Sequence, residues 1–362
     1  MLKPRSLSLK IGDRWFFFFA LILSIFGLFM IFDASSVTAL ADFGDKFYYL
    51  KHQSIWLVLG LVLFFFFAFL DYRLLKKIAL PFLLLSFAFL LAVLIPGIGR
   101  EIYGGRRWLQ IGPLGFQPGE LIKLSLVIYL ATFFEKKRSF SVFVAVVGLS
   151  LALLLLEPDL GTATIIAATA FGLYFIAGAP WKEVLSLGVA IAIVGPILIW
   201  FSPYRRQRLL SFLNSSWDAQ DASYHIRQVL IALGSGGIFG RGLGQSRQKF
   251  LFLPEVTTDS IFAVIAEEFG FLGAGSLVFL FLILVLRGMR LAIYLKDRFA
   301  QLLVAGIIFS LGFQAIVNLG AMVALVPLTG VPLPFISYGG SSLLVSLSGM
   351  GIVYNISKNS KR

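Results

Sequence analysis

Three groups of charged residues in this sequence lie beside long apolar runs, where an unpaired charge is costly. The first is Glu120 and Lys123 in "GFQPGELIKL", the second is Glu157 and Asp159 in "LLLLEPDLGTAT", and the third includes Asp259 in "TTDSIFAVIAEEFG". Carboxylates can act as general bases, and an ammonium can bind an anionic substrate. Each group is therefore a candidate for chemistry.

The first two groups each allow a structural and a functional interpretation. Pro118 suits the first position of a helix, and Glu120 and Lys123 then share one helical face. They form either an internal ion pair between helices or a substrate site in which Lys123 faces an anion. Asp159 either caps the helix that follows a solvated tight turn or belongs to the same site.

The third group holds four carboxylates with different expected roles. Glu267 and Glu268 precede an apolar run, so we expect them at the positive N-terminal end of a spanning helix. Asp259 has uncharged neighbours, and in a helical segment it would share a face with Glu255. An aspartate partly removed from water can accept a proton as a general base.

Other polar motifs give weaker signals. The two histidines, His52 and His225, are isolated, which argues against a histidine metal site or a Ser-His triad. The glycine-rich "GSGGIFGRGLG" lacks the Lys-Ser/Thr of a nucleotide loop and reads as a flexible turn after a short amphipathic helix. The uncharged "LVPLTGVPLPFISYGGSS" predicts a re-entrant loop, buried in protein or lining a cavity.

The composition indicates which elements must position these residues. Of 362 residues, 59% are hydrophobic and only 14% are charged, so the chain reads as an integral membrane protein. There is no cysteine, which excludes disulfides and thiolate metal sites. Because the first apolar run is long and no convincing cleavage site follows it, we interpret it as an uncleaved span rather than a signal peptide.

The apolar runs predict an all-α polytopic fold with ten transmembrane helices in a single integral membrane domain, 1–362. Lys and Arg concentrate in alternate connecting segments, which places both termini in the cytoplasm and explains the net charge of +13. A large extracytoplasmic loop, 202–268, is then expected between helices 7 and 8. The predicted spans are Trp15–Phe32, Ile55–Leu70, Ile78–Ile95, Pro118–Phe134, Phe140–Leu156, Leu160–Ala177, Val184–Phe201, Phe269–Leu286, Phe299–Asn318 and Ile336–Asn355.

This topology brings the charged groups to the outer interface of the membrane. A mixed acidic and basic pocket there suits a substrate that is both lipid and anion. Since no nucleotide is available outside, the energy for a synthetic reaction must come with the substrate. A diphosphate-linked lipid meets that need.

Several stretches together resemble one known family. They are "GGRRWLQIGPLGFQPGELIKL", "EPDLGTATII", "ALGSGGIFGRGLGQSRQKFLFLPEVTTDSIFAVIAEEFGFLGA" and "PLTGVPLPFISYGGSS". In this order they are similar to the SEDS proteins of bacterial cell-wall synthesis (shape, elongation, division, sporulation). The resemblance implies a ten-helix membrane protein that polymerises peptidoglycan glycan strands from lipid II and releases undecaprenyl diphosphate.

The resemblance also implies roles for individual residues. Asp259 matches the essential carboxylate of the family's Pro-Glu-x-x-Thr-Asp motif. Glu120 and Lys123 match Gln-Pro-Ser-Glu-x-x-Lys, Asp159 matches Pro-Asp-x-Gly, and Arg107 matches an Arg-Trp pair. We therefore expect Asp259 to be catalytic and the others to bind substrate.

Three further positions qualify this assignment. Lys249 is an additional predicted substrate-binding residue. Gly119 replaces the family's usual Ser, which should matter little because Pro118 already fixes the helix start. Ser260 replaces the usual Phe, which leaves the local packing open.

The predicted reaction is an inverting glycosyl transfer. Asp259 would deprotonate the acceptor hydroxyl, and Lys123 and Arg107 would offset the charge of the diphosphate. Glu120 and Asp159 would orient Lys123 or hold a divalent cation, Mg²⁺ or Mn²⁺, for which Asp259 is a third candidate ligand.

The setting follows from the same reading. We expect a multi-pass protein of the bacterial cytoplasmic (inner) membrane with a class B penicillin-binding transpeptidase and other divisome or elongasome proteins as partners, and no nucleic acid. "FDASS" and "GQSRQK" favour the division and sporulation branch (FtsW and SpoVE) over the elongation branch (RodA). A lipid II flippase and a non-catalytic scaffold remain alternatives.

Overall fold

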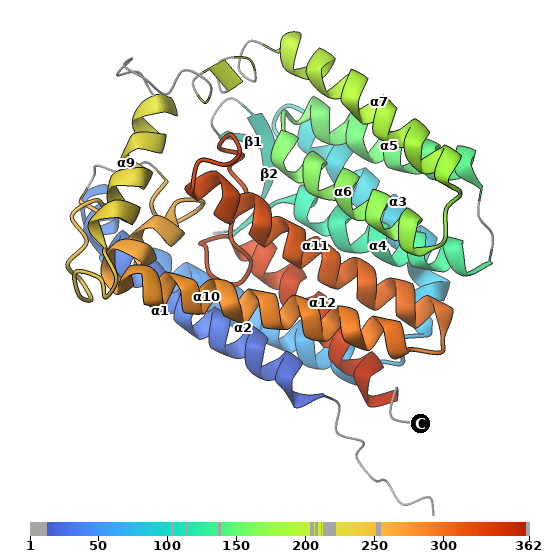
Figure 1. Cartoon of the computed structure of the whole chain (residues 1–362), viewed down its shortest axis with the longest axis horizontal. Coiled ribbons are helices and arrows are strands. Elements are labelled where there is room, and N and C mark those ends of the chain that lie inside the picture. Colours follow the sequence, from blue (N-terminus) through green and yellow to red (C-terminus); the bar gives the residue numbers. More distant parts are fainter. Residues whose placement is uncertain are drawn as a thin grey trace, which may run out of the picture.

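The computed structural model describes residues 13–102, 105–112, 114–136, 139–202, 222–250 and 255–359, together with residues 206, 209, 210 and 212. These residues form eleven helices and a small three-stranded sheet. Most of the helices lie side by side along the long axis of the molecule, whereas α9 runs across this direction at one end and packs against α10 (Figure 1). The fold is therefore mostly helical, rather than all-α as the sequence predicted.

Each of the ten predicted spans overlaps one helix. Six of the helices are long and apolar enough to cross a membrane: α1, α2, α3, α7, α10 and α11. The helices are α1 (Arg14–Phe43), α2 (Tyr48–Phe69), α3 (Leu74–Leu94), α4 (Pro118–Lys136), α5 (Phe140–Leu156), α6 (Leu160–Ile176), α7 (Trp181–Trp200), α9 (Ala222–Ser235), α10 (Ile261–Tyr294), α11 (Arg298–Met322) and α12 (Gly340–Asn359).

Local sequence signals explain several helix ends. Asp13 caps α1 by accepting a hydrogen bond from the Trp15 N–H, and Gly44 ends the helix in a left-handed conformation with φ 69°. Pro118 begins α4, as predicted. Val184 is the only buried residue among those described in α7, so this helix lies at the edge of the bundle.

The segment between α3 and α4 forms an antiparallel sheet that the sequence analysis missed. Its strands are β1 (Gly99–Ile102), β2 (Gly105–Ile111) and β3 (Leu114–Phe116), in the order β1-β2-β3. The strands are short, and one register shift interrupts the pairing of β1 with β2. The sheet carries Arg107 on β2 and leads directly into α4.

The helix α10 begins earlier than predicted and is broken inside. It starts at Ile261 rather than Phe269, and Gly270 leaves helical geometry with φ 66° and ψ −166°. The glycine turn after α9 fills the break. The Arg241 N–H donates to the Glu267 carbonyl (3.0 Å), and the Phe271 N–H donates to the Gly237 carbonyl (2.9 Å). Backbone groups that the break would leave unpaired are satisfied in this way.

This geometry refines the prediction for Glu267 and Glu268. They precede the part of α10 that follows the break at Gly270, as predicted, but they lie in a first helical part of α10 before that break, and both side chains are buried. The predicted extracytoplasmic segment therefore ends in helix, and α9 confirms the amphipathic helix expected within it. Within that segment, residues 203–205, 207–208, 211, 213–221 and 251–254 lie outside the described residues.

The segment 323–339 between α11 and α12 is irregular, as its prolines and glycines predicted. Its residues Leu333, Phe335 and Ile336 are buried in the protein core. A Cβ atom at Gly27 of α1 would lie 2.5 Å from the Phe335 carbonyl oxygen, so glycine is needed for this close approach. Irregular backbone in a membrane protein is stable where protein surrounds it in this way.

Candidate functional site

Lys123 occupies a buried polar position in the middle of the apolar bundle. Its ammonium lies 2.7 Å from a Glu120 carboxylate oxygen, and both side chains are nearly inaccessible. It also donates to the Gln314 side-chain oxygen on α11 at 2.6 Å. The Glu120–Lys123 ion pair is present, but both residues lie on α4. The tie to a second helix comes from Gln314, a partner that the sequence analysis missed.

Two amides of α11, one turn apart, hold the irregular segment 323–339. Gln314 donates to the Pro332 carbonyl at 2.8 Å. Asn318 donates to the Val331 carbonyl at 2.8 Å and to the backbone carbonyl of Asp259 at 2.9 Å. One helix face thus contacts both Lys123 and the Asp259 segment. Their spacing of four residues in an apolar helix was the signal that could have revealed them.

Asp159 caps α6, as the capping interpretation predicted, but the turn is not solvated, because Glu157 and Asp159 are both buried. One carboxylate oxygen accepts from the Thr162 N–H at 3.0 Å, and the other accepts from the Thr162 hydroxyl at 2.8 Å. The second oxygen also accepts from the Gln117 amide at 3.0 Å. Asp159 therefore joins the start of α6 to the start of α4. A Cβ atom at Gly119 would make only ordinary contacts here, so steric fit does not require this departure from the family's Ser.

Arg107 reaches from β2 to the turn between α5 and α6. It donates to the backbone carbonyls of Glu157 (2.8 Å) and Pro158 (2.6 Å). The Glu157 side chain is 1% exposed, and neither carboxylate oxygen has a hydrogen-bond partner among the described residues. Burial and the nearby Asp159 charge raise the pKa of Glu157 to about 9, although Arg107 opposes this. Glu157 is therefore a neutral acid at pH 7.

Asp259 lies in a turn, residues 255–260, and only 8% of it is exposed. The Thr258 hydroxyl lies 3.1 Å from an Asp259 carboxylate oxygen and 2.8 Å from one of Glu255. A hydroxyl has one proton, so it can donate to only one of the two at a time. Because the segment is not helical, the condition under which the two carboxylates would share a helical face is not met.

The residue after Asp259 also has a partner. The hydroxyl of Ser260 lies 2.6 Å from Nε2 of His225 on α9, and both side chains are buried. This contact accounts for the polar residue at the position where the family resemblance implies Phe. Of the two histidines, His225 thus lies beside the predicted catalytic segment.

A small cavity of about 30 Å³ lies against the buried ion pair. Its polar lining includes Glu120, Lys123 and Gln314, and its apolar lining comes from α4, α11 and α12. No three metal-ligating side chains gather among the residues that the structure describes. Glu120 and Asp159 are engaged by Lys123 and by Thr162 and Gln117, so they do not form a closed cation site by themselves.

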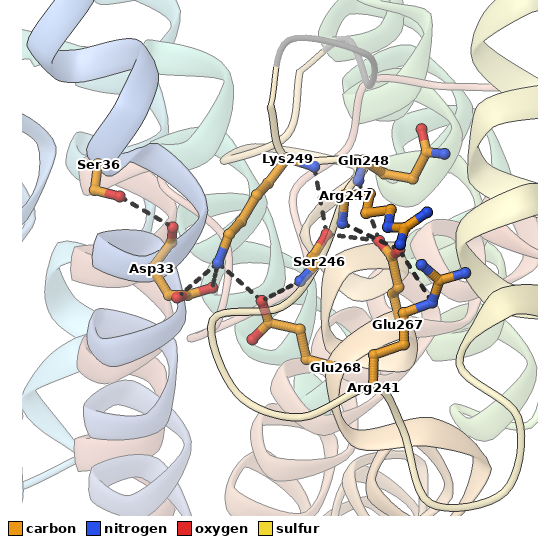
Figure 2. Close-up of polar contacts among 9 residues, drawn as sticks. All are labelled: Asp33, Ser36, Arg241, Ser246, Arg247, Gln248, Lys249, Glu267 and Glu268. Carbon is orange, nitrogen blue, oxygen red and sulfur yellow. Dashed lines mark hydrogen bonds and ion pairs between the residues drawn. The ribbon is translucent and has the colours of Figure 1, made fainter.

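The last predicted substrate residue, Lys249, lies away from this cavity and is already paired. Its ammonium contacts Asp33 of α1 and Glu268 of α10, each at 2.9 Å (Figure 2). Burial lowers the pKa of Lys249, but the hydrogen bonds to the two carboxylates outweigh it, so the net change raises the pKa. Lys249 is therefore a stable cation.

The sequence and the fold both match known proteins. A family described as "Cell cycle protein", the FtsW/RodA/SpoVE family, matches residues 13–362. The chain belongs to this family. It is 39% identical over 347 residues to "Probable peptidoglycan glycosyltransferase FtsW" of Geobacter sp. (strain M18), covering 93% of this chain and 94% of that protein. It is 37% identical over 350 residues to "Stage V sporulation protein E" of Bacillus subtilis (strain 168), covering 94% and 95%.

Solved structures support the same conclusion. The fold matches a chain described under "Structural coordination of polymerization and crosslinking by a peptidoglycan synthase complex", with a TM-score of 0.81, 32% identity, and coverage of 97% and 99%. It also matches the rod shape determining protein RodA of Thermus thermophilus, with a TM-score of 0.72, 32% identity, and coverage of 99% and 100%. With its long apolar helices, the chain is a multi-pass bacterial membrane protein.

Proposed function

We propose that this chain is a peptidoglycan glycosyltransferase that polymerises glycan strands from lipid II. It would act at the outer face of the cytoplasmic membrane, with ten spans and both termini in the cytoplasm. The observation that carries the proposal is the full-length similarity to a probable peptidoglycan glycosyltransferase, 39% identical over 347 residues. The burial and backbone anchoring of Asp259 support it independently.

In this proposal Asp259 is the general base. It takes the proton from the acceptor sugar hydroxyl, whose oxygen forms a bond to the anomeric carbon of the lipid-linked sugar. The bond from that carbon to the diphosphate oxygen breaks, and the electron pair leaves with undecaprenyl diphosphate. Attack from the face opposite the leaving group inverts the anomeric centre.

The cations and their partners would stabilise the leaving group. Lys123 lines the cavity, and Glu120 and Gln314 hold its ammonium in one position, so little reorganisation is needed when charge develops. Only some of the Arg107 guanidinium N–H groups donate to the α5–α6 turn, so this side chain would supply a second positive charge to the diphosphate. Asp159 orders the starts of α4 and α6, between which the diphosphate would approach.

A divalent cation is a separate proposal. Mg²⁺ is often held by one or two carboxylates together with substrate phosphates. Because the described carboxylates make no closed site, any such ion would need the diphosphate as a ligand, with Glu120, Asp159 or Asp259 completing its shell. Polymerisation of lipid II after chelation with EDTA, followed by Mg²⁺ or Mn²⁺ titration, tests this; full activity in EDTA would exclude the ion.

The partner and the process are likewise proposed. One solved relative belongs to a complex that coordinates polymerization and crosslinking. A class B penicillin-binding transpeptidase would pair with this chain in the same way, within a division or sporulation complex rather than an elongation complex. The identities to FtsW (39%) and to stage V sporulation protein E (37%) exceed the 32% identity to RodA of Thermus thermophilus, which supports this branch.

The deciding experiment uses the purified chain with its transpeptidase partner and labelled lipid II. We expect glycan polymer from the parent chain and a loss of roughly 100-fold or more for Asp259→Asn, which keeps the size and shape of the side chain. Complex formation should be unchanged. Full polymerisation by Asp259→Asn would refute the base assignment. Lipid II translocation without polymer would favour the flippase, and complex formation alone would favour the scaffold.

A further inference from the structure

A second polar cluster lies outside the cavity and joins three parts of the chain. Glu267 of α10 accepts from the Ser246 hydroxyl at 2.6 Å and from the backbone N–H groups of Arg247 (3.2 Å) and Gln248 (3.3 Å). The neighbouring Glu268 accepts from the Ser246 N–H at 3.2 Å. The two adjacent carboxylates thus fold the loop segment 246–249 onto the first part of α10 (Figure 2).

Lys249 extends this cluster to another helix. Its ammonium lies 2.9 Å from both carboxylate oxygens of Asp33 and 2.9 Å from one of Glu268. The side chains of Lys249, Asp33 and Glu268 are 5%, 13% and 0% exposed. We call these three residues the Asp33–Lys249–Glu268 triad. It ties α1, the loop and α10 together at one point.

The first part of α10 leads from this triad to the predicted base. Glu268 lies in this part of the helix, which begins at Ile261, two residues after Asp259. Asn318 also holds the backbone of Asp259, and the Tyr338 N–H donates to the Thr257 carbonyl. The triad therefore holds the helix that directly follows the base.

We propose that the Asp33–Lys249–Glu268 triad is a positioning unit for Asp259. The inference rests on the proposed function, because it assigns the triad to the same reaction. The triad fixes the first part of α10 relative to α1 and so sets where the Asp259 carboxylate stands against the substrate. Lys249 acts through this anchoring and not as a ligand of the diphosphate.

The charges of the triad show that stability alone does not account for it. Two carboxylates share one ammonium in a buried place, and one Glu268 oxygen has no hydrogen-bond partner among the described residues. Burying charges costs about as much as their attraction returns, and apolar replacements are often as stable. Removing the Asp33 charge leaves a balanced Lys249–Glu268 pair. A substitution at Asp33 can therefore disturb the positioning of Asp259 without lowering the stability of the protein.

The test compares Asp33→Asn and Asp33→Leu with the parent chain, in complex with the transpeptidase. Asn keeps a neutral hydrogen-bond acceptor, whereas Leu keeps none. We expect the thermal midpoint to stay equal or rise in both. We expect kcat for polymerisation to fall by roughly 10- to 100-fold for Leu and less for Asn, with KM unchanged, because small misplacements of reacting groups cost this much.

A matched control is available at the opposite end of the same helices. Arg287 of α10 pairs with Asp13 of α1 at 2.8 Å, and this pair is partly exposed. Arg287→Met also cuts a tie between α1 and α10, so it reports on loosening of the helix pair in general. We expect its kcat to remain within about twofold of the parent.

A distance measurement gives a readout independent of activity. The chain has no cysteine, so Leu40→Cys on α1 and Phe250→Cys beside Lys249 can be spin-labelled without background. Both positions are exposed. Double electron–electron resonance should give a narrow distance distribution in this labelled chain and with Arg287→Met, and a broad one with Asp33→Leu.

The outcomes separate the two proposals. An inactive parent complex would refute the proposed function. An active parent in which Asp33→Leu retains full kcat, or leaves the distance distribution narrow, would overturn the positioning inference alone. Loss of activity that merely follows a lower thermal midpoint in both Asp33 variants would also overturn it.

Discussion

The buried carboxyl of Glu157 should make this protein less stable as the pH rises. Its pKa is raised from 4.5 to about 9, chiefly by burial. Between these values the folded protein keeps a proton that the unfolded chain has released. Since stability rises with pH only where the unfolded state binds more protons, the sign here is negative. The decrease in the free energy of unfolding begins above pH 4.5 and ends near pH 9.

The size of the effect follows from the linkage relation. Each pH unit inside the window lowers the free energy of unfolding by about 1.4 kcal/mol, so the step from pH 6 to pH 8 lowers it by about 2.7 kcal/mol. Glu157→Gln removes the titrating group. The stability of this variant relative to the parent should therefore increase by about 2.7 kcal/mol over the same step, whatever its absolute value at pH 6.

Unfolding in detergent, followed by tryptophan fluorescence at a series of pH values, measures this difference. Groups that titrate in both proteins cancel in the comparison. The control is Glu101→Gln, whose side chain is 57% exposed and paired with Arg106, and it should show no such trend. Asp159→Asn should narrow the pH range over which the protein loses stability, because the Asp159 charge helps to raise the Glu157 pKa. Parallel pH profiles for the parent and Glu157→Gln would refute the reasoning.

Two further predictions concern the buried ion pair and the packing of α6 against the irregular segment 323–339. Lys123→Met should cost about 3–5 kcal/mol of stability, because it leaves Glu120 buried without its counter-charge. The double variant that also carries Glu120→Gln should recover most of the stability but no polymerisation activity. Recovered activity in the double variant would contradict the role of the cation. Gly161→Ala should cost about 1–3 kcal/mol and reduce activity, since its Cβ would lie 2.8 Å from the Thr329 carbonyl oxygen. Its control, Gly148→Ala, meets nothing within 4 Å and should stay within about 1 kcal/mol of the parent in thermal unfolding; equal losses in both would contradict the packing argument.

The sequence predicted the helices because apolar runs of this length have few alternatives. Each of the ten predicted runs overlaps a helix, and Pro118 and Asp159 stand at helix starts where their chemistry suggested. The ion pair of Glu120 with Lys123 was also predictable, because residues three apart share a helix face. These features depend on neighbours in the sequence.

Features that depend on distant partners were not predictable in the same way. The turn after α9 supplies hydrogen bonds that replace those lost at the Gly270 break. The helical residues before the break, which include Glu267 and Glu268, were therefore not predictable from the local apolar pattern, which begins at Phe269. The short strands between α3 and α4 form by pairing with one another and do not follow an alternating apolar pattern, so the local sequence did not predict them. Lys249 was expected to bind substrate, yet its partners lie on α1 and α10.

The two halves of the candidate site meet on one face of α11. Gln314 contacts Lys123, and Asn318 holds the backbone of Asp259, while both amides also hold the irregular segment at Pro332 and Val331. A shift of that segment would therefore move the cation and the base together. Because each amide divides its hydrogen bonds between the segment and a site residue, neither site residue can relax alone without leaving a buried polar group unpaired. The irregular backbone, which carries no charge of its own, thus sets the geometry between the groups that do.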